Sequence, residues 1–217
     1  MFYREIACLP CSDAASAAGR IPIGFMARQP AQSSLRSVCA GRGQAFALYS
    51  DLLPASDQPK ARDKALDFLL ANIHGERKNH LSTGIMGTKF MLDVLSREGH
   101  ADVACGMVSQ TNFPSWGWML ANGATTLWEH WAISDNTYSQ NHPMFGSVSQ
   151  WFINWLGGIQ PAPGSVGFDH ILIRPQFVKD LTWVRSSHTC MFGKIVSNWR
   201  RTDGEIALEL EGGASVA

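Results

Sequence analysis

One carboxylate in this sequence, Glu129, stands among an unusual concentration of indole rings. Six of the eight tryptophans fall within residues 113–155, and two of them, Trp128 and Trp131, flank that glutamate closely. A carboxylate in a water-poor setting can accept a proton during catalysis, and aromatic faces stack on the C–H faces of sugars. The spacing therefore favours a sugar-binding cleft, against the plainer alternative of a tryptophan-rich core with a glutamate at its rim.

Metal and redox chemistry find little support in the sequence. The five cysteines are scattered and odd in number, unlike a disulfide framework. Cys8 and Cys11 form a CxxC, but no second pair and no paired histidines follow at zinc-binding spacing, so we interpret the motif as coincidental. The histidines considered as ligands also lack a suitable spacing: His74, His80, His130 and His142. We predict neither a metal site nor a cofactor.

The composition is typical of a globular protein with a neutral ligand. The 217 residues are 45% apolar and 17% charged, which allows a sizeable core and is unlike a disordered chain. The 18 basic and 18 acidic residues cancel, so no electrostatic footprint for nucleic acid is present. Apolar runs are shorter than the ~20 residues of a membrane span, and no signal-peptide run follows residues 1–7. We expect no nucleic-acid or membrane partner and, by default, a cytoplasmic location; the oligomeric state stays open.

Two parts of the chain differ in their pattern. Residues 1–42 are rich in Ala, Ser, Gly, Arg and Pro without a helical or strand period, and we predict them to be poorly ordered. From there on, apolar residues recur at helical spacings of three and four, while 123–131 favours an irregular path. The expected helices, paired as hairpins, run from Gln44 to Leu53, from a Ser56 or Asp57 cap to His74, from Phe90 to Arg97 with Thr88 as cap, from Ala101 to Ser109, from Trp118 to Ala121 and from Gly146 to Leu156.

From Gly167 onward the apolar period is two, which indicates strands. They lie in DHILIRP, LTWVRSSHT, FGKIVSNWRR and EIALELE, separated by turns at 175–179, 191–193 and 202–204. Ile195, Ser197 and Trp199 share one face. We expect one antiparallel sheet appended to the helices, an incomplete β-sandwich because the second sheet is lacking, with a C-terminus that looks cut short.

Several motifs occur in a fixed order along the chain: LSTGIMGT (81–88), FPSWGWML (113–120), GATTLWEHW (123–131), NHPMFGSV (141–148) and a tail with ILIRP and HTCMFGKIVSNW. This order, over roughly 44–210, resembles the α-L-rhamnosidases of glycoside hydrolase family 78. The resemblance implies a mainly α, then β chain: a partial (α/α)₆ six-hairpin barrel over 43–160 and a partial C-terminal β-sandwich domain over 161–217. Residues 1–42 do not resemble the family's corresponding segment.

The resemblance also implies residue roles. In the family, the glutamate of the TTxWExW motif is the general base of an inverting hydrolysis, and it falls on Glu129. A histidine that contacts the sugar falls on His142, where a neutral imidazole offers one donor and one acceptor to hydroxyls. Trp128 and Trp131 would wall the cleft against a deoxy-sugar. The alternatives are a glutamate satisfied by backbone amides, barrel-core tryptophans, and a histidine bonded to a carbonyl at a helix start.

The family's general acid lies upstream, in a region rich in Asp, Arg and Trp to which residues 1–43 are not similar. Asp135 is the nearest downstream carboxylate, but the family does not give it this role. We therefore expect a fragment of an inverting glycosidase that acts on terminal α-L-rhamnosyl residues of oligosaccharides or glycosides and is weak or inactive alone. Two alternatives remain: a non-catalytic carbohydrate-binding or interaction module, and another inverting (α/α)₆ glycosidase.

Overall fold

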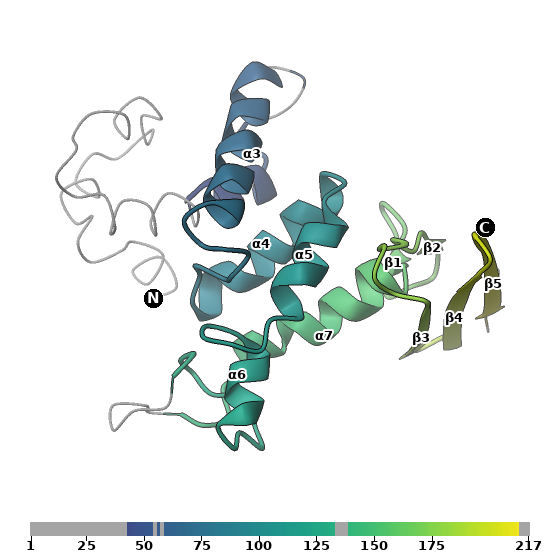
Figure 1. Ribbon diagram of the computed structural model, residues 1–217. Helices are drawn as coiled ribbons and strands as arrows, with labels where there is room; N and C mark the ends of the chain where they lie inside the picture. Colours follow the sequence, from purple (N-terminus) through teal and green to yellow (C-terminus); the bar gives the residue numbers. More distant parts are fainter. Residues whose placement is uncertain (1–42, 54–55, 57–58, 133–138, 213–217) are drawn as a thin grey trace, which may run out of the picture.

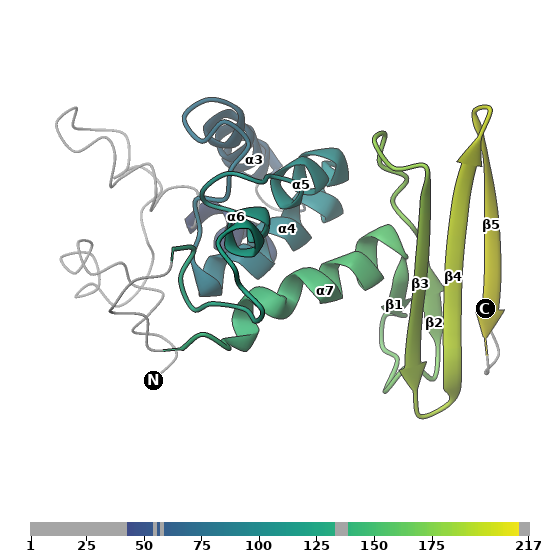
Figure 2. The same cartoon turned by 60° about the horizontal axis from the view of Figure 1, so that its bottom comes forward.

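The computed structural model describes residues 43–53, 56, 59–132 and 139–212; the predicted poorly ordered segment 1–42 lies outside them. Helices come first and antiparallel strands last, which confirms the predicted order of a helical part followed by a β part (Figures 1 and 2). After a helical stretch at 43–49, the elements are α3 (Pro59–His74), α4 (Ile85–Arg97), α5 (Ala101–Val108), α6 (Trp116–Ala121), a 3₁₀ turn (Pro143–Gly146), α7 (Ser147–Trp151), a π-helical turn (Phe152–Leu156), β1 (Ile159–Pro161), β2 (Ile171–Ile173), β3 (Trp183–Cys190), β4 (Gly193–Thr202) and β5 (Glu205–Gly212).

Two helix starts, those of α3 and α6, follow local chemistry, and one predicted start is wrong. α3 begins at Pro59, a position where a missing N–H has no consequence. α6 is capped by Ser115, whose hydroxyl oxygen accepts the Trp118 N–H at 2.9 Å. The predicted start of α4 at Phe90 is wrong, because the helix begins five residues earlier at Ile85. Thr88 therefore lies inside the first turn, where it is fully buried, instead of capping it.

The core is centred on α4, which lies among α3, α5 and α7 (Figure 1). Its apolar residues are completely buried: Met91, Leu92, Val94 and Leu95. Leu69 and Ile73 of α3, and Ala104 and Met107 of α5, close over them from both sides. Because it is packed on all these sides, α4 is a rigid element to which the neighbouring loops can be attached. None of the described helices is long and apolar enough to cross a membrane.

Two small sheets follow the helices, not the single sheet that was predicted. β1 pairs antiparallel with β2, and β3, β4 and β5 form an antiparallel meander in that order. The sequence missed β1 because it is three residues long and includes Pro161, so it carries no strand pattern. Ile195, Ser197 and Trp199, which were predicted to share one face of β4, are each at most 2% exposed, and Val196 on the opposite face is 8% exposed.

The helices and the sheets meet at a close junction after the π-helical turn. The indole N–H of Trp199 donates to the Leu156 carbonyl at 2.8 Å, which ties β4 to the end of the last helix. Gly158 follows with φ +73°, and a Cβ built on it would lie 2.6 Å from the Cα of Pro175. Only glycine permits this approach, so the junction depends on the residue at position 158.

Candidate functional site

The loop that carries Glu129 is fastened to the segment that leads into α7. The Glu129 N–H donates to the Ser139 carbonyl at 3.1 Å, and the His142 N–H donates to the Leu127 carbonyl at 2.7 Å. These bonds hold the two segments side by side, although neither is a regular strand. Glu129 itself is half-buried. A partly exposed carboxylate on a fastened loop can accept a proton from a bound water.

Trp131 joins this loop to the starts of three helices. Its indole N–H donates to the carbonyl of Thr83, just before α4, at 2.7 Å. Its ring lies 4.0 Å, centroid to centroid, from that of Phe145 in the turn before α7, and 5.1 Å from that of Trp116, the first residue of α6. The indole N–H of Trp116 in turn donates to the Phe145 carbonyl at 3.2 Å. Trp131 remains half-buried, so part of its surface is accessible to a ligand.

Trp128, the second predicted wall of the cleft, lies in the same aromatic cluster as Trp131 but is buried in it. Its side chain is 3% exposed and packs in a small cluster with Met119 and Phe145. A ring this covered has little area on which a sugar could stack. The geometry therefore favours the packing alternative for Trp128, whereas the partly accessible Trp131 suits a cleft wall better.

His142 marks the start of the turn that precedes α7. Its Nδ1 accepts the N–H of Met144 at 3.3 Å, so the histidine stands at a helix start, as the alternative expected, but its partner is an amide N–H and not the expected carbonyl. An acceptor Nδ1 places the ring proton on Nε2. The half-buried ring can therefore offer a ligand a single N–H donor, not the donor and acceptor pair expected from the sequence.

Two residues for which no functional role was predicted support Trp131. Thr83 and Thr88 are 1% and 0% exposed, and their hydroxyl oxygens lie 2.9 Å apart. The Thr88 hydroxyl also donates to the Gly84 carbonyl at 2.8 Å. Both threonines belong to the LSTGIMGT motif, which was the available signal, but nothing in its spacing reveals contact with a tryptophan 48 residues away.

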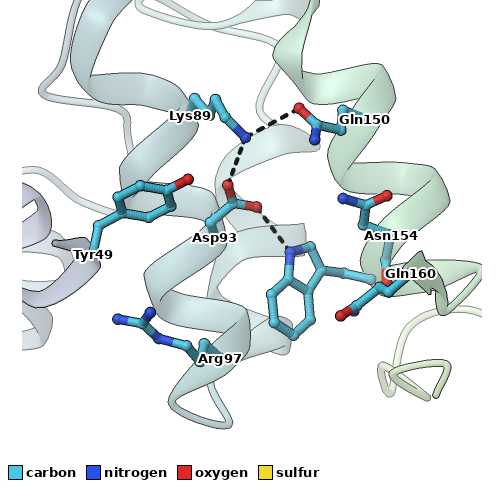
Figure 3. A pocket seen from close by; sticks show the side chains of 8 residues that line it. Tyr49, Lys89, Asp93, Arg97, Gln150, Asn154 and Gln160 are labelled. Carbon is cyan, nitrogen blue, oxygen red and sulfur yellow. Dashed lines mark hydrogen bonds and ion pairs between the residues drawn. The ribbon is translucent and has the colours of Figure 1, made fainter. Parts of the chain in front are cut away.

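A hollow of about 200 Å³ opens between α4 and α7 (Figure 3), and no residue of the loop that carries Glu129 lines it. Four of the residues that line it form one hydrogen-bond network: Lys89, Asp93, Gln150 and Trp155. Asp93 accepts hydrogen bonds from Lys89 at 2.9 Å and from the Trp155 indole at 2.9 Å, and Lys89 also reaches Gln150 at 3.0 Å. This pattern is typical of a network that joins two helices.

The sequence also predicted no metal site, and His130 was one of the histidines considered as a ligand. Among the described residues, no group of three or more His, Cys, Asp or Glu side chains is arranged to hold a metal ion. His130 is exposed. Asp135 lies outside the described residues.

The fold and the site together define a helical-hairpin chain with an appended β unit, and comparison with known sequences identifies the family. The model of the bacterial alpha-L-rhamnosidase six-hairpin glycosidase domain matches residues 24–156, and that of the bacterial alpha-L-rhamnosidase C-terminal domain matches residues 158–212. The chain belongs to the bacterial α-L-rhamnosidase family, whose members are glycosidases.

Individual relatives agree with this assignment. An α-L-rhamnosidase from Streptomyces avermitilis is 36% identical over 156 residues, which are 68% of this chain and 15% of that protein. One from Alteromonas sp. is 32% identical over 169 residues, 72% of this chain and 17% of that protein. The chain thus spans less than a fifth of the length of these relatives.

Solved structures give the same result. The α-L-rhamnosidase structure from Dictyoglumus thermophilum superposes with a TM-score of 0.71 at 34% identity, over 78% of this chain and 19% of that one. The Streptomyces avermitilis enzyme in complex with L-rhamnose has a TM-score of 0.71 at 32% identity, over 78% of this chain and 17% of that one.

Proposed function

We propose that this chain carries the general-base half of an inverting α-L-rhamnosidase site, with Glu129 as the base. The observation that carries the proposal is the fastening of a half-buried carboxylate beside an anchored, partly accessible indole. In an inverting glycosidase, one carboxylate removes a proton from water while a second, protonated carboxyl donates its proton to the leaving oxygen. Water then adds to the anomeric carbon from the face opposite to the bond that breaks.

The neighbouring residues receive matching roles. The Nε2–H of His142 donates to a sugar hydroxyl, and the accessible surface of Trp131 covers the apolar face of a deoxy-sugar. For Trp128 the same role was expected, but its 3% exposure supports packing behind the site. The substrate class that follows from the family is a rhamnose-containing oligosaccharide or glycoside.

The general acid of the family lies in a region to which no motif of this chain is similar. The isolated chain is therefore weak or inactive on ordinary glycosides. A missing general acid matters most when the leaving oxygen needs a proton. An activated leaving group such as 2,4-dinitrophenolate departs without being protonated. A site that has only the base can therefore still hydrolyse that substrate. This difference allows the base to be tested in the chain as it stands.

The test compares hydrolysis of 2,4-dinitrophenyl and unsubstituted phenyl α-L-rhamnosides. We expect slow turnover of the activated substrate alone, reduced about 10²–10⁴-fold in Glu129→Gln, the usual contribution of a general base. Glu205→Gln, on exposed β5, is the matched control and leaves turnover unchanged. Turnover of the activated substrate that survives Glu129→Gln would contradict the assignment of the base.

Glu129→Gln, together with Trp131→Ala, distinguishes the proposed enzyme from a carbohydrate-binding module. Such a module would bind L-rhamnose equally well in Glu129→Gln and would lose binding in Trp131→Ala, without turning over either substrate. Because Trp128 is buried, Trp131 is the accessible ring of the predicted pair on which such a module would depend.

A further inference from the structure

We infer that the buried hydroxyl pair Thr83–Thr88 is a positioning device for the loop that carries Glu129, acting through the indole of Trp131. The inference rests on the proposed function only for the importance of Glu129; the anchoring itself is a separate property of the fold. Thr83 and Thr88 are thus positioning residues, with no contact to substrate required.

The direction of the hydrogen bonds follows from proton counting. A threonine hydroxyl has one proton and can accept as well. The Thr88 proton goes to the Gly84 carbonyl, at 2.8 Å. The 2.9 Å contact between the two hydroxyls must therefore be donated by Thr83 and accepted by Thr88. The result is a chain from Thr83 through Thr88 into the first turn of α4.

This chain fixes the backbone group on which Trp131 depends. The Thr83 side chain is held toward α4 by Thr88, so its own carbonyl is held toward the Trp131 N–H at 2.7 Å. Both threonines are at most 1% exposed, so water cannot replace a lost partner. Hydrogen bonds in such a buried chain strengthen one another, and removing one weakens the next.

Trp131 transmits the constraint to the catalytic loop over two residues of chain. Its ring is also held by Phe145 and Trp116, so it cannot turn without disturbing two helix starts. A loosened indole therefore loosens the loop between Trp131 and the Glu129 N–H, which donates to Ser139. Glu129 is therefore positioned by Thr83, which lies 46 residues before it in the sequence.

The test is hydrogen exchange of indole and backbone N–H groups in the ¹⁵N-labelled full chain. Thr88→Val keeps the side-chain shape and removes the hydroxyl. We expect faster exchange at the Trp131 indole and the Glu129 amide, about 3- to 10-fold, the factor that one net hydrogen bond supports. Thr88→Ser restores the hydroxyl and should return both rates toward those of the parent chain.

Ser96→Ala is the matched control, because Ser96 is a buried hydroxyl on the same helix. It accepts the Trp151 indole N–H at 2.7 Å, so this variant should speed exchange at Trp151 and leave Trp131 and Glu129 unchanged. Equal acceleration of all indoles in Thr88→Val would mean general destabilisation and would overturn the inference. So would a faster Trp131 with an unchanged Glu129 amide. Neither readout uses turnover, so an error about Glu129 chemistry appears in the glycoside assay alone.

Discussion

Replacing Gly158 by alanine tests how the helices are joined to the sheets. This residue follows the last helical turn, and its carbonyl accepts the Arg174 N–H at 2.9 Å. A new Cβ would meet backbone atoms of Arg174 and Pro175, with 2.6 Å to the Pro175 Cα. Backbone atoms cannot rotate away as a flexible side chain can, so the junction itself must open.

Two separate effects set the size of the loss in stability. The left-handed φ of +73° is unfavourable for any L-residue with a Cβ, by about 1–2 kcal/mol. Overpacking against a fixed neighbour adds about 1–3 kcal/mol. We therefore expect Gly158→Ala to lower the free energy of unfolding by about 2–5 kcal/mol, measured by urea unfolding with linear extrapolation.

Gly164 offers a matched control for the first effect. It lies in the loop between β1 and β2 with φ +78°, and an added Cβ there has nothing within 4 Å. Gly164→Ala should therefore show the backbone strain alone, a loss of about 1–2 kcal/mol. Equal losses in the two alanine variants would refute the close approach of the junction, because only the steric effect distinguishes them.

Two further predictions concern the stability of the described residues. Trp199→Phe removes the N–H that bonds the buried Leu156 carbonyl, and we expect a loss of about 1–3 kcal/mol in urea unfolding. Burial, with Asp180 and Asp102 adding to it, raises the pKa of the Cys105 thiol. The pKa of the Cys105 thiol is therefore higher in the folded than in the unfolded chain. Its contribution to the free energy of unfolding is fully present below a pH of about 8.5, the ordinary thiol value, and is lost as the pH rises through the folded pKa. Alkylation of Cys105 at that pH, followed by mass spectrometry, should be slower in the native than in the urea-unfolded chain.

Each of these predictions has a control within the same chain. Trp183 is 57% exposed, so Trp183→Phe should change the free energy of unfolding by no more than about 0.5 kcal/mol. A comparable loss in both tryptophan variants would show that the Leu156 bond is not the cause. For the thiol, Cys105→Ala should make the stability less dependent on pH above 8.5; an unchanged dependence would contradict the assignment to this residue.

Elements with a sustained period could be predicted from the sequence. The helix from Pro59 and the meander of β3, β4 and β5 repeat apolar residues over two or more turns or pleats, and their turn at Asp203 and Gly204 uses residues that adopt the positive φ seen there. β1 could not be found, because three residues ending in proline carry no period. The early start of α4 was hidden by Gly84 and Gly87, which have low helix propensity.

The candidate site divides in the same way. Glu129, Trp131 and His142 could be selected because residue type and motif point to their chemistry. The hydrogen bond from Trp131 to Thr83 could not, since it depends on a contact between segments 48 residues apart. Nor could the burial of Trp128, which lies in an irregular segment where no period tells which side faces inward.

The anchoring of Trp131 bears on how an inverting site can be divided between two parts of a chain. Inversion needs two carboxyl groups about 6.5–9.5 Å apart, because a water must fit beside the base. Where acid and base belong to distant segments, that distance is set by the packing of two elements, each of which must be rigid by itself. In the site proposed above, the hydrogen bonds that join Thr83, Thr88 and Trp131 would supply that rigidity on the base side from within residues 83–131. Under that proposal, the loop that carries Glu129 is ordered without the acid half, and the hydrogen-exchange rate at the Glu129 amide measures that order.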